Sequence, residues 1–173
     1  MALKDRTGSP PRGGAEGCGM RGGRVEVVDR GMRLAPGVSR WLEERATEAL
    51  AVLGAGGEVR VRAVGDAEMA AAHEKYSGVP GTTDVLTFDL GESDGGLDTD
   101  ILVCVDEAGR QSGVRGHTVE QELLLYVVHG VLHCLGHDDH DPDAAARMHA
   151  EEDRVLAAVG VGVTYARGAG GAA

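Results

Sequence analysis

Four histidines and three aspartates are concentrated in the segment HGVLHCLGHDDH and the residue after it, residues 129–141. His129 and His133 are four positions apart, so on a helix their imidazoles project from one face about one turn apart and can bind one cation. The stretch from 123 to 135 is otherwise apolar, and an unpaired imidazole would be costly to bury there. A metal site is therefore favoured over hydrogen-bonded core or surface histidines.

Gly136 follows the second histidine, at a place where a helix can end in a left-handed residue and the chain can turn back. Asp139 then takes the third position in a ligand spacing like that of the metzincin zinc proteases, with a carboxylate in place of their third histidine. We predict one zinc ion per chain, bound by His129, His133 and Asp139, with a fourth position open to water. His140 is the alternative third ligand, because histidine is the commoner zinc ligand.

Gly130 occupies a position that separates classes of zinc hydrolase. Zinc proteases of this spacing read H-E-x-x-H, and their glutamate is the general base for the attacking water. A glycine there disfavours peptide hydrolysis, and phosphodiester cleavage fits better. The remaining histidines are isolated and are interpreted as ordinary structural or surface groups: His73, His117 and His149.

The elements that position these residues follow from periodicity and from start and stop signals. Alternating, β-branched runs predict strands at 24–30, 58–64, 84–90 and 100–106, the last two antiparallel neighbours. Helical spacing predicts helices over 38–53, 66–76 and 118–135 and from 142 onward. Thr118 and Gln121 form a capping box at the start of the apolar helix. We predict an α+β fold: a mixed, roughly four-stranded sheet packed with about five helices, with the metal site on the central helix and the turn after it.

Composition divides the chain into three parts. Residues 1–23 and 160–173 are rich in glycine and lack an apolar period, so both ends are expected to be flexible. Residues 24–159 are expected to form a single hydrolase domain. The longest apolar run is shorter than the ~20 residues that a membrane span needs, which predicts a cytoplasmic protein with no membrane segment. Three widely spaced cysteines, Cys18, Cys104 and Cys134, are expected to be free thiols.

The net charge of −11 argues against a nucleic-acid partner, because Lys and Arg supply most non-specific affinity for phosphates. Most of the 17 basic residues nevertheless lie within residues 1–62, and nearly all are arginines. Local guanidinium contacts to RNA therefore remain open beside the plainer interpretation, in which the acidic surface serves solubility.

The segment HGVLHCLGHDDH resembles the signature H-G-x-L-H-x-x-G-x-D-H of the YbeY family, bacterial endoribonucleases that mature ribosomal RNA. The matching positions are His129, Gly130, Leu132, His133, Gly136 and Asp138. Upstream, TTDVLTF at 82–88 is similar to the family strand P-T-D-V-L-S-F, and the similarity runs from about residue 24 to 158. The resemblance implies a zinc-dependent, single-strand-specific endoribonuclease that acts in 3′-end maturation of small-subunit rRNA and in ribosome quality control. Its implied partners are the ribosomal RNA precursor and ribosomal components.

Two departures from the family pattern leave alternatives open. Asp139 aligns with the family's third histidine, and His73 and Ser77 stand where the family has an asparagine and an arginine. Arg60 and Arg62 are either substitutes for that arginine or an ordinary solvated strand face, and no catalytic residue is assigned. A non-catalytic, zinc-containing ribosome assembly factor and, more remotely, a zinc peptidase are the competing functions.

Overall fold

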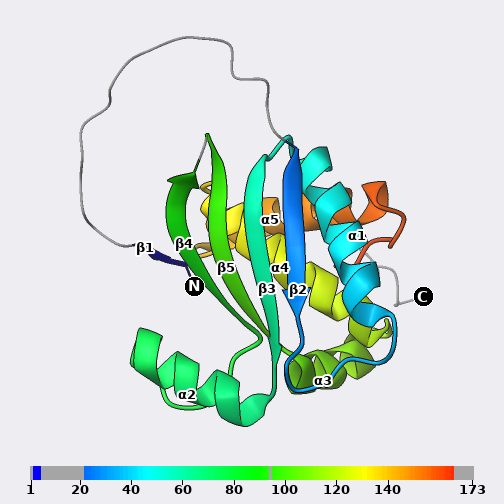
Figure 1. Ribbon diagram of the computed structural model, residues 1–173. Helices are drawn as coiled ribbons and strands as arrows, with labels where there is room; N and C mark the ends of the chain where they lie inside the picture. Colours follow the sequence, from blue (N-terminus) through cyan, green and yellow to red (C-terminus); the bar gives the residue numbers. More distant parts are fainter. Residues whose placement is uncertain (1, 5–21, 94, 166–173) are drawn as a thin grey trace.

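The computed structural model describes residues 2–4, 22–93 and 95–165. A mixed sheet runs through it (Figure 1), with the strand order β1-β4-β5-β3-β2. β4 and β5 pair antiparallel, and the other neighbouring strands pair parallel. The strands are β1 Ala2–Lys4, β2 Gly23–Val28, β3 Gly57–Val64, β4 Val85–Ser93 and β5 Gly96–Cys104.

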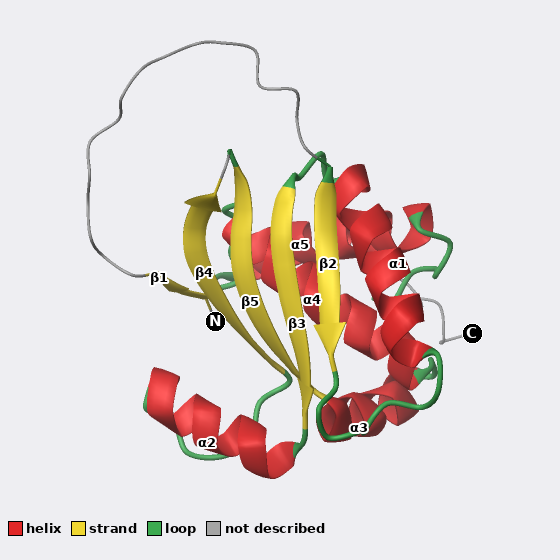
Figure 2. Cartoon of the chain, in the orientation of Figure 1, coloured by secondary structure: helices red, strands yellow, loops and turns green. Residues whose placement is uncertain are grey.

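One face of the sheet carries the main helical layer, and α4 and α5 lie behind the sheet in the view of Figure 2. The helices are α1 Val38–Val52, α2 Asp66–Ser77, α3 Val105–Arg115, α4 Val119–Cys134 and α5 Pro142–Ala158. α4 is central, because its apolar side chains pack against both the sheet and the neighbouring helices in one core cluster. A buried helix of this kind holds its side chains in fixed directions, which suits a metal site.

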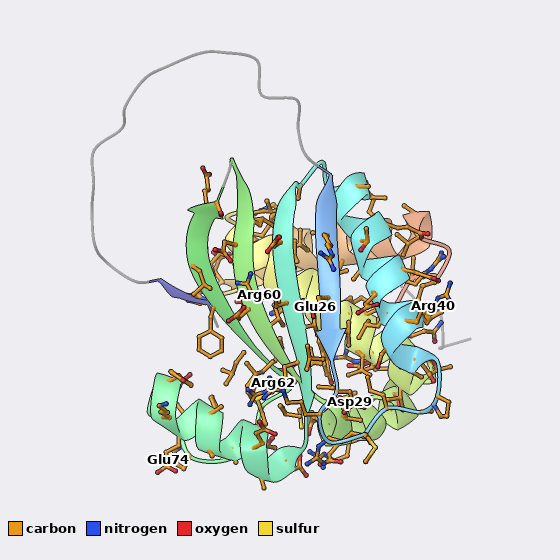
Figure 3. All side chains as sticks on the ribbon, in the orientation of Figure 1. Glu26, Asp29, Arg40, Arg60, Arg62 and Glu74 are labelled. Carbon is orange, nitrogen blue, oxygen red and sulfur yellow. The ribbon has the colours of Figure 1, made fainter. Side chains whose placement is uncertain are left out.

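The opposite face of the sheet is largely open. Glu26 and Arg60 extend from this face, on the side away from α4 (Figure 3). α2 covers one end of it through Met69, which is fully buried against Val64 and Leu86. The sheet therefore has a covered face that supports the metal site and an open, charged face.

The predicted fold class is confirmed, including the antiparallel pair β4 and β5. The predicted capping box is also present: Thr118 Oγ1 accepts from the Gln121 amide, and Gln121 Oε1 accepts from the Thr118 amide. The prediction that the last strand runs to residue 106 is wrong. Val105 and Asp106 begin α3, a helix that was not located from the sequence and whose first turn carries two acidic residues.

The predicted flexible ends fall mostly on residues outside the described part of the chain, namely 1, 5–21 and 166–173. Within the described part, residues 2–4 form β1 beside β4. After α5, the Val161 amide donates to the Leu156 carbonyl, and Gln121 Nε2 donates to the Val161 carbonyl. Among the described residues, no helix has the length and apolarity to cross a membrane.

Gly130 lies where α4 packs directly against the sheet. A Cβ atom at this position would lie 2.4 Å from Thr87 Oγ1 of β4 and 3.1 Å from Ile101 Cδ1 of β5. Thr87 is 2% exposed and Ile101 is fully buried, so a Cβ atom at position 130 would press on side chains that are already packed. Helix–sheet packing therefore favours glycine at position 130.

Candidate metal centre

His129 and His133 lie one turn apart on α4, as their spacing predicts. Their Nε2 atoms are 3.0 Å apart, and the ring planes are at 90° to each other. His133 is buried and His129 is half-buried. The two imidazoles therefore converge on one point at the C-terminal end of the helix.

The second nitrogen of each ring has an acceptor partner. Nδ1 of His129 lies 2.8 Å from Glu152 Oε1, and Nδ1 of His133 lies 3.1 Å from the His137 carbonyl oxygen. A carbonyl or a carboxylate accepts hydrogen bonds, so Nδ1 carries the proton in both neutral rings. Both Nε2 atoms then present lone pairs to each other, an arrangement that is repulsive alone and favourable around a cation.

A Schellman turn ends α4 and brings Asp139, the third candidate ligand, close to the two imidazoles. Gly136 has φ +91°, its amide donates to the His133 carbonyl, and the His137 amide donates to the Leu132 carbonyl. The turn places Asp139 Oδ2 3.9 Å from His129 Nε2 and Oδ1 3.9 Å from His133 Nε2. His129, His133 and Asp139 thus form a group whose ligand atoms lie within 4.8 Å of one another.

This geometry fits a tetrahedral zinc ion. With bonds of about 2.0–2.1 Å, two ligand atoms of such an ion are about 3.3 Å apart. The observed separations of 3.0 and 3.9 Å fall on either side of that value. Two neutral imidazoles and one carboxylate are also a common donor set for catalytic zinc, because three protein ligands leave the fourth position open.

Electrostatics favour the protonation states that bind metal. Burial, and then the neighbouring His129, hold the pKa of His133 below its usual value. Partial burial acts to raise the pKa of Asp139, but the nearby His133 and His129 outweigh it and the net direction is downward. The imidazole is thereby kept neutral and the carboxylate ionised at neutral pH.

His140, the alternative third ligand, is not a member of this group of three candidate ligands. Its side chain is 74% exposed, and its Nδ1 lies 2.9 Å from Asp138 Oδ1. It belongs to a second, exposed group with Asp138 and Asp139, and its Nδ1 lies 3.4 Å from Asp139 Oδ1. Cys134 lies on another side of the helix, where its Sγ accepts a hydrogen bond from Thr99 of β5.

Glu152 is the residue at this site that sequence reasoning missed. It is fully buried on α5 and bonds to His129 across a gap of 23 residues. A signal was present in the sequence, because Glu152 falls in register with Met148, Val155 and Leu156 on the apolar stripe of α5. A carboxylate on a buried stripe needs a polar partner, and a metal-ligating histidine is a frequent one.

The arginines considered as substitutes for the family arginine lie elsewhere. Arg60 pairs with Asp98 and Asp100 on the open face of the sheet. Arg62 pairs with Glu68 on the same face, and both arginines are labelled in Figure 3. α4 packs on the opposite face, so these side chains do not reach the His129–His133 pair. Of the residues at the family positions, His73 faces the Gly81 carbonyl oxygen, and Ser77 ends α2.

Fold and site together define a small α+β domain that presents two helix-borne imidazoles and a carboxylate to a single point, as zinc hydrolases do. The family model described as endoribonuclease YbeY matches residues 30–160, and the chain belongs to that family. The resemblance found in its two motifs is thereby confirmed.

Individual relatives agree with the family assignment. The chain is 39% identical over 118 residues to endoribonuclease YbeY of Aromatoleum aromaticum, covering 68% of this chain and 76% of the relative. It is 35% identical over 112 residues to the Mycobacterium ulcerans protein of the same name, covering 58% and 63%. The match thus spans less than two thirds of the mycobacterial protein. The solved structure of TM1509 from Thermotoga maritima is similar with a TM-score of 0.57 and 25% identity, covering 78% of this chain and 88% of that one.

Proposed function

We propose that this protein is a metal-dependent endoribonuclease that cuts single-stranded RNA and acts in 3′-end maturation of small-subunit rRNA and in ribosome quality control. In this proposal, one zinc ion per chain is held by His129, His133 and Asp139. The ribosomal RNA precursor and ribosomal components are its partners, and the protein works in the cytoplasm. Membership of the YbeY family supports the reaction and the substrate class.

One observation carries the metal-dependent part of the proposal. Two Nε2 lone pairs face each other at 3.0 Å, with their tautomers set by Glu152 and by the His137 carbonyl. A bound zinc ion would supply Lewis acidity, polarising a phosphoryl oxygen and lowering the pKa of water. The chain's own contribution is to bring three ligand atoms to one point, within 4.8 Å of one another. Asp139 is the most exposed of the three, with 35% of its side chain accessible to solvent.

The peptidase alternative loses support at Gly130. A glutamate there would meet Thr87 and Ile101 in the helix–sheet contact, on a side of α4 that faces β4 and β5. The position that carries the general base in H-E-x-x-H proteases therefore cannot carry one here.

The assembly-factor alternative has one observation in its favour. The exposed turn beside the site is acidic, with Asp138, Asp141 and Asp143 next to Asp139. Phosphates are repelled by such a surface unless cations screen it. An assembly factor that binds protein components would tolerate this charge, so catalysis has to be measured directly.

We expect the purified, zinc-loaded protein to cut single-stranded RNA slowly and to leave casein intact. A chelator should stop RNA cleavage, and added zinc should restore it. His129→Ala should be inactive, while His73→Ala, which removes a histidine outside the site, should match wild type. Gel analysis of labelled RNA, beside a duplex of the same sequence, measures all of these.

Other results of this experiment would each have a different interpretation. Casein hydrolysis by wild type but not by His129→Ala would establish a peptidase. Zinc binding without cleavage of either polymer would favour the assembly factor. RNA cleavage that persists in His129→Ala would point to a contaminating nuclease.

We also expect Asp139→Asn to weaken zinc affinity at least about 10-fold and His140→Ala to leave it close to wild type. The reason is geometric: Asp139 faces both Nε2 atoms, whereas His140 is 74% exposed and groups with the carboxylates of the turn. Competition with a chromophoric chelator gives both affinities. The reverse ranking would make His140 the third ligand.

A further inference from the structure

The C-terminal end of α2 and strand β4 place two aromatic rings together on the open face of the sheet. Phe88 of β4 packs against the same apolar cluster as Met69 of α2. Tyr76 lies edge-on to Phe88, with ring centroids 4.9 Å apart and an interplanar angle of 76°. Phe88 is half-buried, but Tyr76 is 45% exposed. An edge-on contact covers only part of each ring, so aromatic surface stays open to solvent here.

Lys75 adds a positive charge beside these rings. Its Nζ donates to the Tyr76 hydroxyl at 3.2 Å and lies 4.7 Å from the ring centroid, so the ammonium stands at the hydroxyl end of the ring. Lys75 makes no ion pair with a described carboxylate, whereas Arg60 and Arg62 on the same face are paired with acidic side chains. Lys75 can therefore bind a phosphate without giving up an existing ion pair.

Structural roles account for part of this arrangement. A lysine in the last turn of α2 interacts favourably with the helix dipole, and the edge-on rings help to hold α2 on the sheet. The fully buried Met69 already anchors the helix, and neither role requires an exposed ring beside an unpaired ammonium. Proteins bind single-stranded RNA through this pair of features, because bases stack on aromatic side chains and cations contact the phosphates.

The aromatic pair and the metal centre lie on opposite faces of the same stretch of β4. Thr87, the residue before Phe88, packs against Gly130, the residue after His129. β1 is the outer neighbour of β4 at these positions. A nucleic acid that reaches both places has to bend round this edge of the sheet. A single strand can follow that path, whereas a duplex is stiff over many base pairs.

We infer that Lys75, Tyr76 and Phe88 form a binding platform for single-stranded RNA, in which a base stacks on the Tyr76 ring and a phosphate contacts the Lys75 ammonium. The inference rests on the proposed function and deepens it, since the platform supplies affinity while the metal centre cuts. Glu74, beside Lys75, is also exposed, so electrostatic attraction is weak here and stacking has to supply most of the affinity. The platform does not touch the candidate ligands, so it should govern KM and not kcat.

The first test measures the affinity of the zinc-loaded full chain for a labelled oligoadenylate by fluorescence anisotropy, on ice and before cleavage is visible on a gel. Tyr76→Ala should weaken binding at least about 5-fold, and Tyr76→Phe, which keeps the ring, should stay within about 2-fold of wild type. Lys75→Ala should bind more weakly and lower the slope of log affinity against log salt by about 0.7, the contribution of one phosphate contact.

Arg40→Ala is the control for the loss of one positive charge. Arg40 is 84% exposed on α1, away from α2 in Figure 3, and pairs with Glu44. This variant should keep the affinity and the salt slope of wild type. An abasic oligomer of equal length separates stacking from charge: Tyr76→Ala should bind it as wild type does, while Lys75→Ala should bind it more weakly. A general loss of structure would weaken both oligomers alike.

The second test measures RNA cleavage by the same zinc-loaded proteins. Tyr76→Ala and Lys75→Ala should raise KM by the factor found for binding and keep the wild-type kcat. The inference fails if wild type does not bind the oligoadenylate, or if both alanine variants bind it as tightly as wild type; in the second case the patch is a surface for a protein partner. RNA binding that depends on both residues, without cleavage by wild type, would uphold the platform and refute the proposed function.

Discussion

His133→Ala is expected to abolish stoichiometric zinc binding. Two ligands would remain, and the Schellman turn would lose the imidazole that bonds to the His137 carbonyl. Elemental analysis after dialysis should give one zinc per wild-type chain and essentially none for the variant. Thermal unfolding supplies a second readout, because a ligand that binds the folded state at 100 times its dissociation constant stabilises it by about 2.7 kcal/mol. Added zinc should raise the melting temperature of wild type and leave that of His133→Ala unchanged.

His73→Ala is the control for this experiment, since His73 is half-buried on α2 and faces the Gly81 carbonyl oxygen. It should retain one zinc per chain and the same thermal response as wild type. Stoichiometric zinc in dialysed His133→Ala would mean that the ion binds elsewhere, and the proposed centre would have to be abandoned.

Gly130→Glu is expected to destabilise the fold severely, although it creates the H-E-x-x-H pattern of zinc proteases. Its Cβ would lie 2.4 Å from Thr87 Oγ1, and its carboxylate would be forced into the contact between α4 and the sheet. Overpacking alone costs about 1–3 kcal/mol, and an unpaired buried charge costs more. We therefore expect Gly130→Ala to lose about 1–3 kcal/mol in the free energy of unfolding, and Gly130→Glu to lose more than about 3 kcal/mol. Denaturant titration measures both.

Gly113 offers a matched control within a helix. It lies in α3, and a Cβ atom added there would have no neighbouring atom within 4 Å, so Gly113→Ala and Gly113→Glu should be neutral or stabilising by up to about 1 kcal/mol. Unchanged stability of Gly130→Glu together with casein hydrolysis would overturn the packing argument and reopen the peptidase function.

The histidine pair and its turn could be predicted from the sequence because their geometry is local. A spacing of four on a helix fixes the relation of His129 to His133, and Gly136 fixes where the chain reverses. The choice of Asp139 over His140 as third ligand stays a prediction, but the turn brings Asp139 toward the imidazoles, as that choice requires.

Contacts between distant parts of the chain were not predictable in the same way. Glu152 comes close to His129 because α5 packs on α4, and no periodicity within either helix encodes that pairing. α3 was missed since its sequence, with Gly109 and Gly113, carries a weak helical signal. The short strand β1 also depends on a distant contact. Its three residues form a strand by pairing with β4, which is far away in the sequence.

The candidate ligands all fall between residues 129 and 139, and the carboxylate that orients His129 comes from the next helix along the chain. No strand contributes a ligand from the described residues. A bound ion would therefore join neighbours in sequence, whereas the main core is built from strands β2 to β5 and helices α1, α3, α4 and α5. Small zinc-finger domains, in contrast, owe their folded state to the metal. In this protein, folding can therefore precede loading of the proposed ion. Occupancy should then follow the current supply of metal in the cell and not the conditions under which the chain was synthesised.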